Sequence, residues 1–222
     1  MITQQMWPSL RLIYVGDPMC YRCYGFGQEL SVALAQRPKA QLEIVVGGLR
    51  AGGTDVLDEA GKRFRLAHWT RVEAATSLPF NREALMARQG FVYDTEPICR
   101  AVVAARIAEP VADQLAVFRA LQRAFYVEGL DTTDADVLVR VTTQALQAQG
   151  FAAERLRDCY HAQVTAATTR EEFAQVRRWG ISSFPALLMR DDGAVELVVD
   201  GFTKTDALLT AIDRVARRRT SA

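Results

Sequence analysis

Apolar and polar positions divide this chain into two strand-bearing ends and a helical middle. A continuous apolar run at 12–15 ends at Gly16-Asp17-Pro18, which predicts a buried central strand followed by a turn. From Cys20 the apolar residues recur every three or four positions, so we expect a helix that stops before Pro38. A second apolar run lies at 42–46. Strand, helix and strand at this spacing predict a βαβ unit with two parallel strands.

The middle of the chain, residues 55–178, carries only helical spacing. Its apolar residues stand three and four positions apart, in segments separated by prolines and glycines. The last of these helices is expected to open at the capping-box pattern Thr169-Arg-Glu-Glu172. Strand signals return at 186–189 and 195–199, with a short turn between them that favours an antiparallel hairpin.

These patterns predict an α/β fold in which the two ends of the chain share one mixed sheet. The sheet-bearing domain is expected to comprise residues 8–54 and 179–222, and residues 55–178 are expected to form a helical domain inserted into it. A final helix that opens at Thr203-x-x-Asp206 would cover the sheet.

Composition excludes several classes of function. Of the 222 residues, 50% are hydrophobic and 24% charged, and the net charge of +1 gives no field to attract nucleic acid or a membrane surface. No stretch is apolar enough to span a membrane. Met1–Pro8 lacks the pattern of a secretory signal, so we expect a cytoplasmic protein whose thiols are kept reduced. The oligomeric state stays open.

The chemistry most evident in the sequence lies at Cys20-Tyr21-Arg22-Cys23, at the predicted junction of strand and helix. The first N–H groups of a helix have no internal partners and the helix dipole is positive there, so a thiolate at Cys20 is favoured. Arg22 adds a positive charge. Both effects should lower the Cys20 pKa below the value of about 8.5 for a free cysteine. Cys20 would then exchange with disulfides, and Cys23, one turn later, would resolve the mixed disulfide.

Two alternatives stay open at this point. The cysteine pair could be half of a zinc site, but Cys159, His161 and His68 are the only further ligands and form no second pair, so we expect no bound metal. Pro185, which follows Phe184, could simply begin a strand in the trans form. It could instead form a cis bond and expose backbone for a substrate.

Six short segments, spread over nearly the whole chain, carry a family resemblance. They are Asp17-Pro-Met-Cys-Tyr-Arg-Cys-Tyr-Gly-Phe26, Gly47-Gly-Leu-Arg50, His68-Trp69, Tyr93-Asp-Thr-Glu-Pro97, Cys99-Arg-Ala101 and Phe184-Pro185. On these residues the chain resembles the DsbA-like family of thioredoxin-fold proteins. Within that family it is similar to the bacterial cytosolic group of protein-disulfide isomerases akin to FrnE.

The resemblance implies a thioredoxin-like fold with a large all-helical insertion. It also implies that Pro185 is cis and lies beside Cys20, that Cys20 is the nucleophile and that Cys23 is the resolving thiol. The implied partners are protein or small thiol and disulfide substrates, with no bound cofactor beyond the redox-active pair and with glutathione as electron partner. Tyr21-Arg22 replaces the group's commoner Ser-Trp, which leaves the direction of electron flow open.

Other residues have two interpretations each. Asp17 could relay protons to the thiols or shape the turn, and Phe184, Tyr21 and Arg22 could tune the site or contact substrate. His68 and Trp69 could line a substrate cleft, or they could be a core tryptophan beside a satisfied histidine. Cys99 and Cys159 are expected to be a buried apolar residue and a surface thiol, respectively.

Two further functions compete with disulfide exchange. One is a glutathione-dependent isomerase or transferase of the kappa or hydroxychromene-carboxylate isomerase type. Those proteins resemble this fold but have Ser at the first cysteine position, whereas Cys20 is present here. The other is a non-enzymatic redox sensor or partner-binding module.

Overall fold

Four strands form one mixed sheet within residues 10–191 and 193–220, the part of the chain that the computed structural model describes. The strands are β1 (Arg11–Gly16), β2 (Gln41–Val46), β3 (Ala186–Asp191) and β4 (Ala194–Asp200). Their order is β2-β1-β3-β4, with β1 parallel to β2 and antiparallel to β3, and with β3 antiparallel to β4. The predicted βαβ unit and hairpin are confirmed. Met1–Pro8, including the expected domain start at residue 8, lies outside the described residues.

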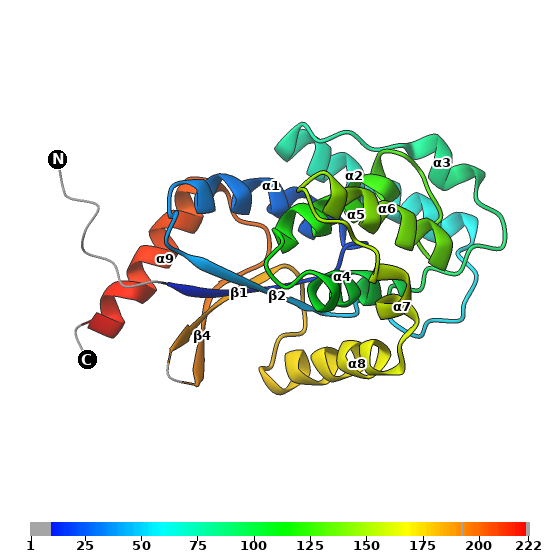
Figure 1. Cartoon of the computed structure of the whole chain (residues 1–222). Coiled ribbons are helices and arrows are strands. Elements are labelled where there is room, and N and C mark those ends of the chain that lie inside the picture. Colours follow the sequence, from blue (N-terminus) through cyan, green and yellow to red (C-terminus); the bar gives the residue numbers. More distant parts are fainter. Residues whose placement is uncertain (1–9, 192, 221–222) are drawn as a thin grey trace.

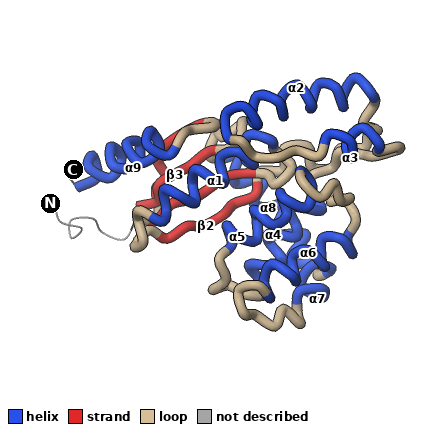
Figure 2. Tube along the Cα trace, turned by 90° about the horizontal axis from the view of Figure 1, so that it is seen from above, coloured by secondary structure: helices blue, strands red, loops and turns tan. Residues whose placement is uncertain are grey.

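Helices flank the sheet and extend beyond one end of it. Their bounds are α1 (Tyr21–Ala35), α2 (Glu59–Thr76), α3 (Arg82–Ala87), α4 (Glu96–Ala108), α5 (Gln114–Tyr126), α6 (Ala135–Gln147), α7 (Leu156–His161), α8 (Gln163–Arg178) and α9 (Thr205–Thr220). Helices α1 and α9 lie on one side of the sheet and α8 on the other (Figure 1). Helices α2–α7 gather past the end at which β1 finishes (Figure 2). None of the described helices is both long and apolar enough to cross a bilayer.

A single cluster of buried apolar residues runs from the sheet into the helices. Tyr14 on β1 illustrates this, because its ring contacts Phe26 of α1 and Phe118 of α5 at centroid distances of 5.6 and 5.3 Å. The end of β1 therefore packs both against α1, which lies on the sheet, and against α5 of the helical region. The division of the chain into domains at 54/55 and 178/179 stays a prediction.

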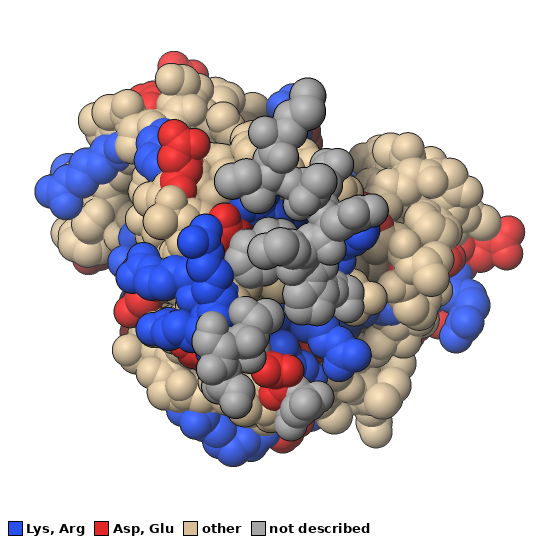
Figure 3. Space-filling model, turned by 90° about the vertical axis from the view of Figure 1, so that its left-hand side faces the viewer, with Lys and Arg blue, Asp and Glu red and all other residues tan. Residues whose placement is uncertain are grey.

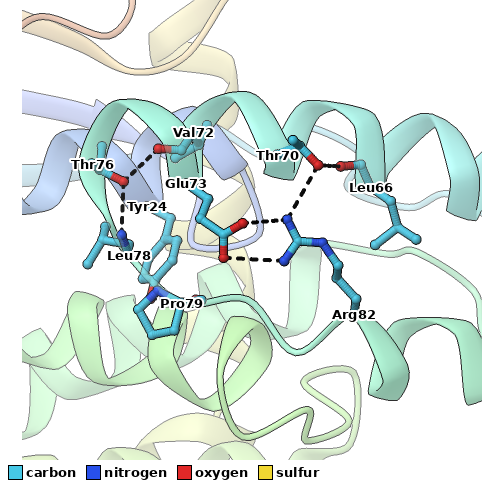
Figure 4. Close-up of polar contacts among 9 residues, drawn as sticks. All are labelled: Tyr24, Leu66, Thr70, Val72, Glu73, Thr76, Leu78, Pro79 and Arg82. Carbon is cyan, nitrogen blue, oxygen red and sulfur yellow. Dashed lines mark hydrogen bonds and ion pairs between the residues drawn. The ribbon is translucent and has the colours of Figure 1, made fainter.

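Helix α2 packs along α1 and is anchored by polar contacts where it turns toward α3 (Figure 4). The guanidinium of Arg82 donates to both carboxylate oxygens of Glu73, at 2.6 and 3.3 Å. The Tyr24 hydroxyl of α1 donates to the Pro79 carbonyl at 3.2 Å. Close packing of α2 on α1 also needs Gly25, where an added Cβ would lie 3.0 Å from a Val72 methyl carbon.

The expected start of the last inserted helix is wrong. Helix α8 begins at Gln163, six residues before the predicted cap at Thr169, which lies buried inside the helix and donates to the Thr165 carbonyl. Glu172 does not cap a helix. Its carboxylate accepts from the Val46 amide of β2 at 2.9 Å and pairs with Arg106 of α4. The side chains that form the capping pattern in the sequence therefore make other contacts in the folded chain, and no helix begins at Thr169.

The expectation of a surface thiol at Cys159 is also wrong. Cys159 is only 8% exposed, because helix α7 packs among α4, α6 and α8 and turns this face of the helix inward. Cys99 is fully buried on α4, as expected.

Charged side chains of both signs mix at the end of the molecule that carries α9 (Figure 3). Ion pairs there join Arg37 to Asp213 and Arg218 to Glu196. Exposed pairs of this kind contribute at most about 1 kcal/mol each. The mixture matches the near-neutral net charge.

Candidate active site

The two cysteines lie where the chain leaves β1 and begins α1. Cys20 is the N-cap residue of α1, and its N–H closes the preceding turn by donating to the Asp17 carbonyl at 3.0 Å. Cys23 sits in the first turn of the helix. Their exposed fractions are 2% and 0%, so Cys23 is the more enclosed, and both are free thiols.

The surroundings push the pKa values of the two thiols apart. Burial opposes ionisation of Cys20, but the Cys23 thiol and backbone N–H outweigh it and, with the charge of Arg22, lower the Cys20 pKa. Burial, and then the neighbouring Cys20 sulfur, raise the Cys23 pKa well above its ordinary value. One sulfur is therefore ready to ionise and the other holds its proton.

Asp17 holds the turn from inside. One carboxylate oxygen accepts from the Met19 N–H at 2.8 Å and the other from the Leu49 N–H at 2.7 Å, and the thiol of Cys99 lies 3.6 Å from the second oxygen. Burial raises the Asp17 pKa despite these hydrogen bonds. The geometry is that of a turn-shaping residue, and a proton-relay role for Asp17 stays a prediction.

The Phe184–Pro185 peptide bond is cis and faces the cysteine pair. The Cys20 thiol donates to the Phe184 carbonyl with a sulfur–oxygen distance of 3.6 Å. The Phe184 ring lies over the chain after β2, so close that a Cβ on Gly47 would fall 2.2 Å from it. The long separation in sequence between Cys20 and Pro185 is thus closed by the antiparallel pairing of β1 with β3.

A cleft of about 350 Å³ opens beside the cysteines. Its lining residues are Tyr21, Arg22, His68, Arg71, Val72, Ala75 and Phe202. The Tyr21 ring stacks on the His68 ring with centroids 4.8 Å apart. Burial, together with the charges of Arg71 and Arg22, lowers the His68 pKa, so this ring is neutral near pH 7. Neither arginine pairs with a described carboxylate.

His68 and Trp69, which were considered together as cleft residues from the sequence, have different surroundings in the structure. His68 lines the cleft, whereas Trp69 is 1% exposed and stacks on Phe80 in the aromatic core. The expectation that Trp69 contacts substrate is therefore corrected, since neighbouring residues of a helix point in directions about 100° apart. Arg71 and Phe202 were missed. Helical spacing from His68 could have indicated Arg71, but no local signal points to Phe202.

Two tyrosines of the helical region also reach the site. The hydroxyls of Tyr93 and Tyr126 both donate to the carbonyl of Met19, each at 2.6 Å. Tyr93 belongs to one of the family-like segments, but nothing in the sequence links Tyr126 to the cysteines.

Among solved structures, a candidate protein disulfide isomerase from Nitrosomonas europaea is 29% identical, with a TM-score of 0.84 over 95% of this chain and 99% of that one. The cytosolic disulfide reductase DsbM from Pseudomonas aeruginosa is 22% identical, with a TM-score of 0.76 over 94% and 100%. This chain has the DsbA-like thioredoxin fold. No family model and no curated protein matches it.

The DsbA-like fold is shared with an enzyme of different chemistry. A 2-hydroxychromene-2-carboxylate isomerase is 13% identical, with a TM-score of 0.64 over 95% of this chain and 98% of that one. Such a likeness shows the fold alone. The expected fold, a thioredoxin-like sheet with many added helices, is confirmed.

Proposed function

We propose that this protein is a thiol–disulfide oxidoreductase in which Cys20 is the nucleophile and Cys23 the resolving thiol. The observation that carries the proposal is the opposed environment of the two sulfurs: the pKa of Cys20 is lowered while that of Cys23 is raised. Disulfide exchange needs a thiolate that attacks and a second thiol within reach. Pro185, in its cis bond beside Cys20, completes the proposed site, in which the backbone of the preceding residue, Phe184, would meet an extended substrate.

The reduced form acts on a disulfide in two steps. The Cys20 thiolate attacks one sulfur, the S–S bond breaks, and a substrate thiolate leaves as the Cys20–substrate disulfide forms. Cys23 then loses its proton and attacks Cys20, which releases the second substrate thiolate and leaves a Cys20–Cys23 disulfide. The substrate gains two electrons and the protein loses two. Two molecules of a small thiol return these electrons by the reverse exchange.

Glutathione is the small thiol that we propose as electron partner. One solved structure of DsbM carries GSH, at 22% identity and a TM-score of 0.68 to this chain. The cleft beside Cys20 suits an anionic tripeptide, because Arg22 and Arg71 pair with no carboxylate in the described part of the chain and Tyr21 stacked on His68 offers a flat apolar surface. A reductase or isomerase supplied by glutathione would work in the cytoplasm, the location that we propose.

The glutathione-dependent isomerase is the second candidate that the fold allows. It is less well supported, because that chemistry needs no second thiol and this site places Cys23 against Cys20. Conversion of a small electrophile by a Cys23→Ser variant at the wild-type rate would favour it.

Turnover tests the proposed function directly. Wild-type protein with glutathione should reduce insulin or a mixed disulfide, and Cys20→Ser should abolish the reaction. Cys23→Ser should stop after the first step and accumulate a covalent Cys20–substrate adduct, visible by intact mass. Cys159→Ser, which removes a thiol far along the chain on α7, is the matched control and should retain activity. Undiminished turnover by Cys20→Ser would rule the proposal out.

A further inference from the structure

Met19, the residue before Cys20, has a carbonyl that the helix does not use. Helix α1 takes its first hydrogen bond from the Cys20 carbonyl, which accepts from the Tyr24 N–H at 3.0 Å. The Met19 carbonyl lies one residue earlier, in a buried turn. A buried carbonyl needs partners from elsewhere in the molecule.

Two tyrosine hydroxyls fill both acceptor positions of this carbonyl. Tyr93 precedes α4 and Tyr126 ends α5, and each donates at 2.6 Å, within the ordinary range for an O–H···O bond. Both rings are buried. The ring of Tyr93 is further held by the guanidinium of Arg65, whose central carbon lies 4.1 Å from the ring centroid. Each bond also satisfies a buried hydroxyl, and together the two bonds direct two O–H dipoles at a single oxygen.

The position of this carbonyl gives the two bonds a consequence for Cys20. It belongs to the Met19–Cys20 peptide, whose N–H donates to the Asp17 carbonyl. A bare carbonyl oxygen in the peptide that leads directly into Cys20 would oppose a thiolate on that residue. Two O–H donors draw electron density away from that oxygen and polarise the peptide, so that its charge opposes the thiolate less. The same two bonds fix the orientation of the N-cap residue.

We propose that Tyr93 and Tyr126 are positioning residues that, through the Met19 carbonyl, favour the ionised form of Cys20. The inference rests on the proposed function and deepens it, because it assigns part of the tuning of the reactive thiol to the helical region rather than to the residues between the cysteines. The tyrosines do not touch the reacting sulfurs. Their effect is on how readily Cys20 ionises and on how stable the reduced pair is.

The test replaces tyrosine by phenylalanine, which removes only the hydroxyl. The variants are Tyr93→Phe, Tyr126→Phe and the double variant, and the readout is the pH profile of Cys20 alkylation by a neutral reagent. The matched control is Tyr24→Phe. The Tyr24 ring stacks on that of Tyr126, but its hydroxyl donates to the Pro79 carbonyl and not to the Met19 carbonyl (Figure 4).

We expect the double variant to raise the midpoint of the alkylation profile and to slow alkylation at pH 7 about three- to ten-fold. The equilibrium with glutathione should shift toward the Cys20–Cys23 disulfide by a similar factor, since the reduced form loses stabilisation. Each single variant keeps one donor and should show a smaller shift of the same sign. Tyr24→Phe should leave both readouts unchanged.

A merely structural role predicts a different pattern. Lower thermal stability of the tyrosine variants with an unchanged alkylation profile would overturn the inference. If the double variant does not fold, the two single variants provide the same comparison. Failure of the proposed function is distinguishable, because the wild-type protein itself would then show no lowered Cys20 midpoint and no exchange with glutathione disulfide.

Discussion

The sheet side and the helical side of this active site differ in what they contribute. In the proposed mechanism the sheet side, formed by β1, the start of α1 and the loop before β3, supplies the reactive atoms: both sulfurs and the cis Phe184–Pro185 bond. In the same proposal the helical side supplies groups that act on those atoms from a distance. These are the two tyrosine hydroxyls on the Met19 carbonyl and the cleft residues of α2. In this proposal the reactive thiol is formed by residues close in sequence, and its pKa and substrate contacts depend on residues far along the chain.

The contrast suggests how such a fold can change its chemistry. A thiolate at a helix start needs only a strand, a turn and a helix in sequence order, which is a local arrangement. Substrate contacts and fine tuning depend on segments far along the chain. Substitutions on the helical side should therefore alter rates and substrates, whereas substitutions on the sheet side should also disturb the fold.

Asp17→Asn tests the sheet side and should have the larger effect. Asparagine has one acceptor oxygen where the carboxylate uses two, so the buried N–H of Met19 or Leu49 loses its partner and stability should fall by about 1–3 kcal/mol. The negative charge of Asp17 raises the Cys20 pKa, so its removal should shift the alkylation midpoint of Cys20 to lower pH. Denaturant unfolding and the alkylation profile measure the two effects.

The control for this variant is Asp94→Asn. Asp94 also accepts from two backbone N–H groups, those of Gly52 and Glu96, but it does not act on the Cys20 pKa. Both N–H groups bond the same oxygen, Oδ1, and asparagine keeps one acceptor oxygen, so this variant should change stability little and leave the Cys20 profile unshifted. An equal shift in both variants would mean that the Asp17 charge is not what acts on the thiol.

Arg71→Gln tests the helical side and should have the smaller effect. Because Arg71 lines the cleft without a carboxylate partner among the described residues, its loss should raise the KM for glutathione disulfide about three- to ten-fold and leave the KM for a neutral disulfide unchanged. Stability should change by less than about 0.5 kcal/mol. Arg63→Gln, on the same helix and paired with Glu59, is the control. A KM that rises equally for both disulfides would contradict a role in recognising charge.

Sequence reasoning succeeded where the determinants are local. The strand at 12–15, the turn at Asp17 and the helix from Cys20 follow from adjacent residues, and the structure places them as expected. It failed where packing decides. Thr169 and Glu172 form a capping pattern, but α8 begins at Gln163 and continues past it, and the Glu172 carboxylate bonds β2 and α4 instead.

The site shows the same limit. The placement of the cysteines could be predicted, yet Tyr126 and Phe202 lie more than 100 and 175 residues from Cys20, and only the folded chain brings them to it. Trp69 and His68 could not be told apart, because a step of one residue, about 100° around the helix, separates core from cleft and the apolar pattern of α2 is weak. Such contacts need the tertiary arrangement.

The central claim is that the two sulfurs are held in opposite states, and their alkylation in the reduced wild-type protein tests it most directly. The protein is treated with a limiting neutral alkylating reagent across pH 5–10, and each cysteine is quantified by peptide mass. A lowered pKa predicts that Cys20 reacts first, with a midpoint below the value of about 8.5 for a free cysteine. The raised pKa of Cys23 predicts that it stays unmodified throughout that rise. Equal rates at the two cysteines, or a Cys20 midpoint at or above that of a free thiol, would contradict the account.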